Sequence, residues 1–352
     1  MLDMICTRPK LSAIGLNIDA HEFRAVQLME TSKGIHTVAW AIFPRRDENM
    51  DHAKRAVLPA PDELRWAADI LSRRGFVGNT VSIAPSTWEC SSHIIELPPV
   101  ESGAPVDQLA QMEVARAKKC GPEDFEIGYW TLPAKGRIQE TLAVACPRSV
   151  INDTIERFES AGLIPVGIDL LELAISRAGQ DGATENEINA SLHIGWRSSL
   201  AVLSLGKTVI YIRRIENGAS SVWDLATSRY GLSSKGADAI MDDQMRTDGA
   251  RGYAKIKRAT WSALASELAN ELDVTIAYVA HSFRTAPLGK IFLSGYGSVN
   301  PVIDEHLDKV LGIPIECAAP SALIKGIGSG QGVWSLACRL STAYGLAVRF
   351  DR

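Results

Sequence analysis

A strand–turn–strand pattern occurs twice in this chain and constrains its fold more than any other feature of the sequence. The first copy, Ile14–Leu28, reads IGLNIDAHEFRAVQL, with two short apolar runs around a polar turn. The second copy, Ala190–Leu203, reads ASLHIGWRSSLAVL, and aligning the copies places Leu16–Asp19 on Leu192–Gly195. Short apolar runs joined by a tight turn are typical of β-hairpins. A hairpin that recurs after a long interval predicts a duplicated α/β domain rather than a solenoid.

The length, charge and cysteine pattern exclude several classes of protein. The chain has 352 residues, of which 46% are hydrophobic and 22% charged, so we expect two or more globular domains. A net charge of −4 leaves no basic excess to neutralise phosphates, and we expect no nucleic-acid partner. No apolar run approaches the roughly 18–20 residues that span a membrane, and Met1–Lys10 has no signal-peptide pattern, which favours a cytoplasmic protein. The six cysteines are scattered without a CxxC pair, so we expect reduced thiols and no metal site.

Apolar runs and helical patterns between and after the hairpins predict the remaining helices and strands. Residues 85–147 form a candidate inserted module, which has prolines at both ends and starts with the extended stretch SSHIIELPPV. It continues with a helix over Val106–Lys119 and strands over Glu126–Leu132 and Glu140–Ala145. After the second hairpin we expect a long helix over Arg258–Arg284, with the basic stretch RGYAKIKR before it as an exposed loop.

Together these features resemble the actin-like ATPase superfamily, in which two hairpins and a later glycine turn face a nucleotide. Within it the chain is similar to the PilM family of type IV pilus assembly proteins, which are themselves similar to the cell-division protein FtsA. The stretches that carry the resemblance run in family order along nearly the whole chain: IGLNIDAHEFRAVQL, VSIAPSTWECSSHIIELPPV, GIDLLELAISRA, FLSGYGSVNPVIDEHLDKVLGIPIE and TAYGLAVR.

The resemblance implies an α/β fold of duplicated actin-like (ribonuclease H-like) domains with an inserted FtsA-type module, named 1C. The implied division assigns residues 11–84 and 148–180 to domain 1A, 85–147 to module 1C, 188–219 and 286–352 to domain 2A, and 220–285 to subdomain 2B.

The resemblance also implies a nucleotide site between the two domains. Glycine at a turn tip lets backbone N–H groups approach phosphate oxygens, and an aspartate in each hairpin organises Mg²⁺ through hard oxygen ligands. If ATP and magnesium are bound, we expect them at the matching positions of this chain, which are Asn17, Asp19, Arg24, His193, Gly195, Gly295 and Gly297.

Several of these positions depart from the superfamily pattern. In the first hairpin, Asn17 and Asp19 stand where aspartate and glycine are usual, and only the basic residue Arg24 is kept. In the second hairpin, His193 replaces the aspartate, and in the third turn Tyr296 adds bulk where adenosine would approach. A carboxylate about 4 Å from a phosphate charge costs about 4 kcal/mol at an effective dielectric of about 20. We therefore expect a degraded nucleotide site and assign no catalytic residue.

The function implied is a cytoplasmic scaffold of a type IV pilus, or related secretion, inner-membrane assembly platform. The implied partner is the cytoplasmic N-terminal segment of a PilN-like inner-membrane protein, which would hold the chain peripherally at the membrane, and other platform proteins are further candidates. We expect the partner near module 1C, where Ile94, Ile95 and Leu97 form an apolar strand, because strand edges recruit extended segments.

Two other functions stay open at the level of sequence. One is an active ATPase or small-molecule kinase of the same fold. The other is the cytoplasmic half of a secretion-system protein whose relative continues into a transmembrane helix, whereas this sequence reaches Arg352 without one. The choice between pilus and secretion machine, and the question of filament formation, stay open with them.

Overall fold

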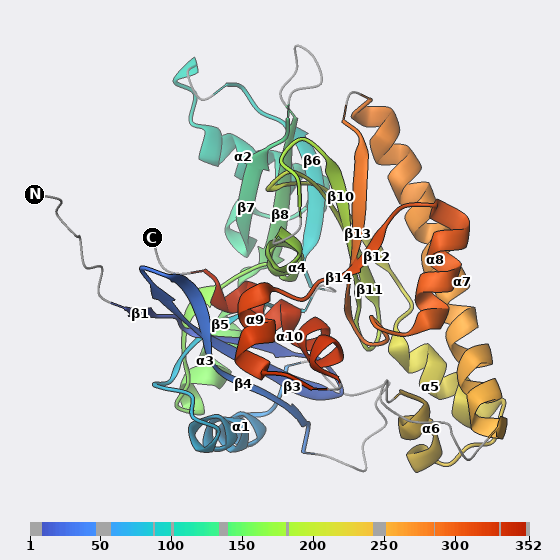
Figure 1. The fold of residues 1–352 in the computed structure, drawn as a ribbon. Helices are drawn as coiled ribbons and strands as arrows, with labels where there is room; N and C mark the ends of the chain where they lie inside the picture. Colours follow the sequence, from blue (N-terminus) through green and yellow to red (C-terminus); the bar gives the residue numbers. More distant parts are fainter. Residues whose placement is uncertain are drawn as a thin grey trace, which may run out of the picture.

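A computed structural model gives the structure of this chain for residues 9–46, 58–86, 89–99, 102–133, 140–180, 183–241, 251–284, 286–330 and 332–349. Two large β-sheets and one small sheet organise these residues (Figure 1). The small sheet stands at one end of the molecule with helix α2, and the last helices of the chain lie beside the first large sheet. The predicted duplicated α/β organisation is therefore present.

The first large sheet is built around the N-terminal hairpin. β2 and β3 form this hairpin, β4 pairs with the other side of β3, and β2, β5 and β9 run parallel. The resulting order is β4-β3-β2-β5-β9, with the short β1 also beside β3. The strands span Lys10–Leu11 (β1), Ile14–Ile18 (β2), Glu22–Thr31 (β3), Gly34–Pro44 (β4), Thr80–Ile83 (β5) and Ile164–Ile168 (β9).

Helices cover both faces of the first sheet because its central strands are apolar on both sides. Phe23 of β3 is buried on one face with Leu64 and Phe158, whereas Val26, three residues later in the same strand, is buried on the other face with Leu323. The helices on the first of these faces are α1 (Pro61–Arg73) and α3 (Arg148–Ser160), and those on the second are α9 (Ser321–Ile327) and α10 (Val333–Ala347).

The second large sheet repeats the connectivity of the first. Its order is β12-β11-β10-β13-β14, in which β10 and β11 form the second hairpin and β13 runs parallel to β10. Each strand thus has a counterpart in the series β4-β3-β2-β5-β9. The strands span Ile188–Ile194 (β10), Ser199–Leu205 (β11), Thr208–Ile215 (β12), Leu288–Gly295 (β13) and Ile315–Cys317 (β14).

A group of helices shares a core with the second sheet, and Trp261 is fully buried at its centre. The helices of this group are α5 (Ala219–Ser228), α6 (Ser234–Met241), α7 (Arg251–Ser282) and α8 (Pro301–Leu311).

Among the helices in the described residues, none combines the length and the apolar character that a membrane span needs.

Two helices link the large sheets. α10 packs on β2 and β3 of the first sheet, on β13 of the second, and along α4 (Leu171–Gly179). Glycines permit these close approaches: a Cβ atom at Gly15 would overlap the carbonyl oxygen of Ala343, and one at Gly345 would overlap that of Ala174. β2, α10 and α4 therefore pack so closely that no side chain larger than the hydrogen of glycine fits at these two positions.

The small sheet and its helix form a compact unit, which we call the three-stranded unit. Its order is β6-β8-β7, and α2 covers one face, as the predicted succession of strand, helix, strand, strand requires. On the opposite face, Trp130 Nε1–H donates a hydrogen bond of 2.7 Å to the carbonyl of Val209 in β12. The unit therefore contacts the second large sheet directly. Its elements span Ser91–Glu96 (β6), Val106–Lys118 (α2), Phe125–Thr131 (β7) and Glu140–Pro147 (β8).

One predicted loop is wrong. The stretch RGYAKIKR, expected to precede a helix, is the first part of helix α7, which begins at Arg251 rather than Arg258. Tyr253 and Ile256 are spaced to lie on one helical face and pack against the core of the second large sheet. The basic residues between them masked this apolar face in the sequence, and Arg258 itself pairs with Glu305 of α8.

Candidate functional site

The turn of the first hairpin is built by Asp19. Its Oδ1 accepts hydrogen bonds from the backbone N–H groups of His21 (2.7 Å) and Glu22 (2.9 Å), and its own N–H donates to the carbonyl of Glu22 (3.1 Å). Aspartate side chains commonly close turns in this way. The residue that departs most from the superfamily pattern is therefore the residue that shapes this turn.

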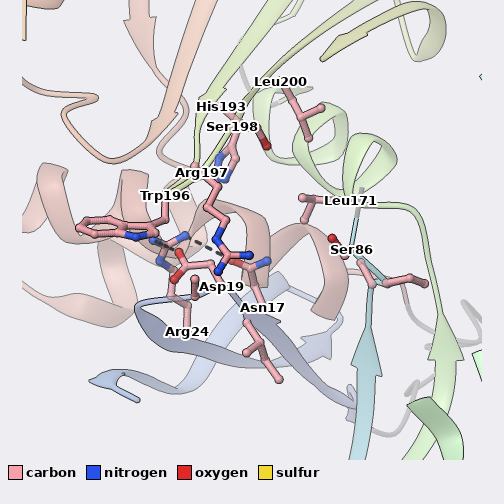
Figure 2. A pocket seen from close by; sticks show the side chains of 15 residues that line it. Asn17, Asp19, Arg24, Ser86, Leu171, His193, Trp196, Arg197, Ser198 and Leu200 are labelled. Carbon is pink, nitrogen blue, oxygen red and sulfur yellow. Dashed lines mark hydrogen bonds and ion pairs between the residues drawn. The ribbon is translucent and has the colours of Figure 1, made fainter. Parts of the chain in front are cut away.

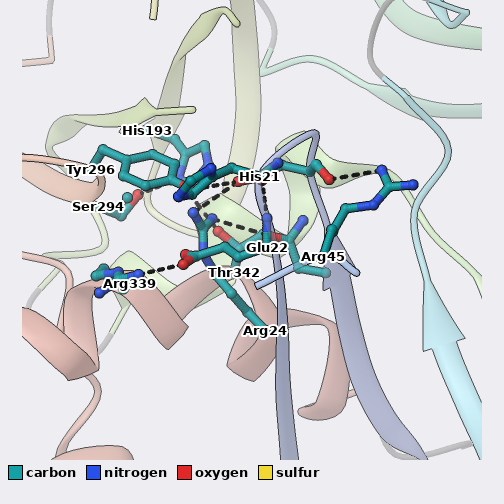
Figure 3. Close-up of polar contacts among 12 residues, drawn as sticks. His21, Glu22, Arg24, Arg45, His193, Ser294, Tyr296, Arg339 and Thr342 are labelled. Atoms are coloured by element: carbon teal, nitrogen blue, oxygen red, sulfur yellow. Dashed lines mark hydrogen bonds and ion pairs between the residues drawn. The ribbon is translucent and has the colours of Figure 1, made fainter. Parts of the chain in front are cut away.

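The retained basic residue, Arg24, is buried between two carboxylates (Figure 3). Its guanidinium pairs with Asp19 Oδ2 at 2.9 Å and with Glu22 Oε1 at 2.6 Å, and it donates to Asn17 Oδ1 at 3.3 Å. Burial acts to lower the pKa of Arg24, but Glu22 and Asp19 outweigh it and raise that pKa. Burial likewise acts to raise the pKa of Asp19, but Arg24 and the two backbone donors lower it. Both groups are therefore ionised at neutral pH.

The third turn and the last helix complete this charge cluster. Tyr296 donates its hydroxyl to Asp19 Oδ2 at 3.3 Å, and its ring lies 4.7 Å from the Arg24 guanidinium. Arg339 of α10 pairs with Glu22, and its guanidinium lies 5.9 Å from the centre of the Tyr296 ring. Burial, together with Asp19 and Glu22, raises the pKa of Tyr296 well above its usual value, so it remains a donor.

Three aromatic rings, one from each turn, meet above this cluster. His21 and Trp196 stack with ring centres 4.5 Å apart and planes 11° apart. The Tyr296 ring lies edge-on to Trp196, with centres 5.5 Å apart. Trp196 is 2% exposed. The two hairpins and the third turn are therefore in direct side-chain contact where the superfamily comparison predicts a nucleotide.

His193 occupies the position of the second aspartate as a buried imidazole. Its Nδ1 lies 2.9 Å from Ser294 Oγ and 3.4 Å from Thr342 Oγ1 (Figure 3). Burial, with a contribution from Arg24, lowers the pKa of His193 to about 3, so the ring is neutral at physiological pH. A neutral imidazole gives no negative charge to attract magnesium. Within the described part of the chain, no cluster of histidine, cysteine and acidic residues could hold a metal ion.

The three predicted glycines are required by backbone packing. A Cβ atom at Gly195 would lie 2.5 Å from the carbonyl oxygen of Ser198. Gly295 has φ +84°, and a Cβ atom there would overlap the carbonyl oxygen of Ile194. Gly297 has φ +65°, and a Cβ atom there would overlap the ring of Trp261. Their presence is explained without phosphate.

A small cavity remains between the hairpins (Figure 2). Its volume is about 70 Å³, and five of the seven predicted nucleotide residues line it: Asn17, Asp19, Arg24, His193 and Gly195. Sequence reasoning missed Trp196 and Arg197, which also line it, and Arg197 extends from the second hairpin toward Asn17. The sequence signal that could have identified both residues is their position directly after Gly195, at the tip of the second hairpin.

A larger cleft of about 510 Å³ lies where the three-stranded unit meets the first large sheet. One wall comes from β7 and β8, and the other from the end of β9 and the start of α4. One wall of the cleft is charged, since Arg177 pairs with the buried carboxylate of Asp169 and Arg349 lies 3.9 Å from the same carboxylate. It is lined by Pro85, Glu126, Ile127, Gly128, Tyr129, Trp130, Val144, Cys146, Ile151, Ile168, Asp169, Leu170, Leu173, Arg177 and Arg349.

The residues expected to bind a partner, Ile94, Ile95 and Leu97, lie in or next to β6, which is the edge of the three-stranded sheet opposite β7. Ile94 is 46% exposed, whereas Ile95 and Leu97 point to the other face and are buried against α2. Of these three, only Ile94 presents its side chain to solvent.

Two large sheets of identical strand order, with paired hairpins and a glycine turn meeting between them, define the actin-like class of α/β proteins. Solved structures share this fold. A PilM–PilN type IV pilus biogenesis complex matches with a TM-score of 0.72 and 18% identity, over 96% of this chain and 98% of that chain. The ethanolamine utilization protein EutJ from Carboxydothermus hydrogenoformans matches with a TM-score of 0.52 and 12% identity, over 97% and 91%. An archaeal actin homologue matches with a TM-score of 0.50 and 10% identity, over 96% and 98%.

The sequence itself identifies the family. The family model described as type IV pilus assembly protein PilM matches residues 15–350. This chain belongs to the PilM family of type IV pilus assembly proteins. A comparison with curated proteins gives no match. The family resemblance drawn from the sequence, and the actin-like fold that it implied, are confirmed.

Proposed function

We propose that this PilM-family protein is a cytoplasmic scaffold of a type IV pilus inner-membrane platform and does not hydrolyse nucleotide. The observation that carries the proposal is the closure of the three turns by their own side chains. Asp19 is bonded to Arg24 and Tyr296, and the Trp196 ring is stacked on the first hairpin. Buried ionic and aromatic contacts of this kind favour one fixed arrangement of the hairpins, which suits a scaffold.

A magnesium polyphosphate would find few partners between the hairpins. Mg²⁺ prefers carboxylate and water oxygens, but the two aspartate positions hold Asn17 and the neutral His193. The carboxylate of Asp19 is already compensated by Arg24. The cavity of about 70 Å³ is also far smaller than the roughly 300–1,000 Å³ of small-molecule sites. An active ATPase or kinase of this fold is the alternative function that nucleotide binding would support.

The larger cleft supports a docking role. The similar solved structure is a complex of PilM with PilN, and we propose that this chain binds a PilN-like inner-membrane protein through that protein's cytoplasmic N-terminal segment. Within the described residues, β7 pairs only with β8 and β9 only with β5, so each has an open edge beside the cleft. Open strand edges accept extended segments by strand addition. Such a partner would hold the chain at the cytoplasmic face of the membrane.

The cleft also supports the domain division predicted from the sequence. We take the three-stranded unit as module 1C, the first large sheet as the centre of domain 1A, and the second as the centre of domain 2A. On this division the proposed partner site lies between 1A and 1C, and the closed turns lie between 1A and 2A.

Binding of a fluorescent ATP analogue with Mg²⁺ tests the first half of the proposal. We expect no saturable binding at micromolar concentration by the unaltered chain. The Asp19→Gly variant, measured beside it, shows whether the carboxylate alone blocks phosphate: gain of binding would identify Asp19 as the obstacle, and continued absence would identify the aromatic closure. Micromolar, magnesium-dependent binding by the unaltered chain would contradict the proposal and favour the ATPase alternative.

A glycine in the cleft wall tests the second half. Gly128 lines the cleft and a Cβ atom there meets nothing within 4 Å, so Gly128→Trp adds bulk to the cleft from a position with open space around its Cβ. Calorimetric titration with a synthetic peptide of the partner's N-terminal segment should lose binding in this variant. Gly252→Trp on α7, a glycine with equally open surroundings, is the matched control and should bind normally. Equal affinity in both variants would place the partner elsewhere.

A further inference from the structure

Two cysteines lie opposite each other at the base of the three-stranded unit. β6 and β8 pair antiparallel with Ser91 opposite Ala145, and continuing this register by one residue places Cys90 opposite Cys146. Opposed residues of an antiparallel pair have Cα atoms about 4.5–5.5 Å apart, within the range of about 4.4–6.8 Å that a disulfide bridges. The two thiols are close enough for each to shift the pKa of the other, and both are reduced. Disulfide formation thus needs little movement of the backbone.

The pair lies where the chain crosses between the first large sheet and the three-stranded unit. Cys90 is on the segment that leads from β5 into β6, and Cys146 is near the end of β8, just before α3 begins. These two crossings are the covalent connections of the unit to the rest of the chain. Cys146 also lines the large cleft. A bond between the two sulfur atoms would therefore join the connections on which any movement of the unit depends.

The surroundings favour Cys146 as the first thiol to react. Its contact with Cys90 lowers its pKa, and Lys118 acts in the same direction, although burial and Glu89 oppose both. A lowered thiol pKa increases the thiolate fraction, which is the nucleophilic form. Cys90 is partly exposed, and Cys146, although buried, lines the large cleft, so a small oxidant can reach the pair from solvent.

We propose that Cys90 and Cys146 form a reversible thiol–disulfide pair that fixes the three-stranded unit relative to the first large sheet. The oxidant is a peroxide. The Cys146 thiolate attacks one peroxide oxygen and breaks the O–O bond, which gives a sulfenic acid and, after protonation, water. The Cys90 thiol then attacks the sulfenic sulfur, the S–S bond forms, and a second water leaves. Two thiols lose two electrons and one peroxide becomes two waters, and a dithiol reverses the step by exchange.

The regulatory consequence rests on the proposed function of the cleft. On this proposal, the unit moves relative to the first sheet when an extended segment enters the cleft between β7 and β9. A disulfide at the base of the unit prevents its two connections from moving independently. We therefore expect the oxidised protein to bind the partner segment more weakly than the reduced protein.

The disulfide is tested on the full chain with hydrogen peroxide, alkylation of the remaining thiols, and peptide mass spectrometry. We expect a linked Cys90–Cys146 peptide that dithiothreitol abolishes, together with slower amide hydrogen exchange in β6 and β8. Cys90→Ser should lose the linked peptide. Cys120→Ser, which removes an exposed cysteine of the same unit, should retain it. If Cys90 and Cys146 both remain open to alkylation under peroxide that oxidises Cys120, the proposal is overturned.

The regulatory step is tested by titrating the partner peptide into the reduced and oxidised proteins. We expect the dissociation constant to rise about tenfold on oxidation, which corresponds to about 1.4 kcal/mol. The Cys90→Ser variant should bind equally before and after peroxide. An unchanged constant in a fully linked protein would overturn the regulation. Failure of the peptide to bind even the reduced protein would refute the proposed cleft function, while the linked peptide and the slowed exchange would still report the disulfide itself.

Discussion

The contact among the three turns and the cleft beside the three-stranded unit are built in opposite ways. Between the turns, charged and aromatic side chains from distant parts of the chain are buried against one another and leave a cavity of about 70 Å³. In the cleft, the buried carboxylate of Asp169 pairs with Arg177 and lies near Arg349, which is 53% exposed, and the volume is about 510 Å³. The position that is a ligand site in the superfamily pattern has the properties of a protein core, and the space available to a partner lies at the unit beside it.

The largest expected effect concerns the charge at the centre of the turns. Arg24→Ala removes the cation that compensates Asp19 and part of the compensation of Glu22; Arg24 and Glu22 are buried, and the Asp19 side chain is 18% exposed. Removing one partner of a buried ion pair costs about 3–5 kcal/mol. Urea unfolding at pH 7 should show a loss of that size. A loss below about 1 kcal/mol would mean that the turns are not held together as a core.

The next effect is a pH dependence from His193. Its pKa is about 3 in the folded protein and near 6.5 when the chain is unfolded. Between these values the unfolded state binds a proton that the native state does not, so stability is full above about pH 6.5 and falls as the pH is lowered. This group alone should cost about 2 kcal/mol at pH 5.

His193→Asn should flatten the stability profile between pH 7.5 and pH 5, measured by urea unfolding. The same substitution at the exposed His36 is the control and should leave the profile of the unaltered chain in place. A profile that His193→Asn does not change would show that the imidazole is protonated in the folded state.

A smaller effect is expected where the three-stranded unit contacts the second large sheet. Trp130→Phe keeps an aromatic ring but removes the hydrogen bond to the carbonyl of Val209. The expected loss is about 1 kcal/mol in unfolding. Hydrogen exchange of the variant should increase in β7 and not in β2. Exchange that increases equally in both strands would mean that the unit does not move separately from the first sheet.

The smallest effect is expected at the rim of the cleft. Arg349→Ala is the same substitution as Arg24→Ala, but Arg349 is half exposed and 3.9 Å from Asp169. The Asp169 carboxylate is buried but keeps its pairing with Arg177, and a half-exposed arginine at this distance contributes about 0–1 kcal/mol, so urea unfolding should change little. The contrast between the two arginine variants measures how different the two regions are. Similar losses in both would remove that distinction.

The sequence predicts the fold well because local patterns determine most of it. Both hairpins can be predicted from apolar runs around a polar turn. The strand–helix–strand–strand order of the three-stranded unit can be predicted from the apolar runs between the prolines at its two ends. The start of α7 was missed because Lys255 and Arg258 suggested a loop, although Tyr253 and Ile256 carry the apolar face that packs. A helical pattern of apolar residues is a weak signal when only two such residues, here Tyr253 and Ile256, define the face.

The candidate site was predicted in its members but not in its energetics. Asn17, Asp19, Arg24 and His193 do line one cavity. From the sequence alone, Asp19 is an isolated charge that repels phosphate, whereas in the structure its charge is compensated by Arg24. Glu22 cannot be identified as part of the site from the sequence, because a glutamate in a strand gives no signal of pairing with Arg339 at the other end of the chain. Contacts between residues so far apart in sequence depend on the tertiary fold.

The close approach at Gly345 lies where the two halves of the molecule are joined. α4 follows the last strand of the first large sheet, α10 comes after the last strand of the second, and the two helices pack backbone to backbone at this glycine. Helices that follow two sheets of the same strand order and pack on each other are the arrangement found in a twofold-symmetric homodimer. The chain therefore carries, between its two large sheets, a contact of the kind that joins the subunits of such a dimer. Either half expressed alone would expose that surface and should self-associate.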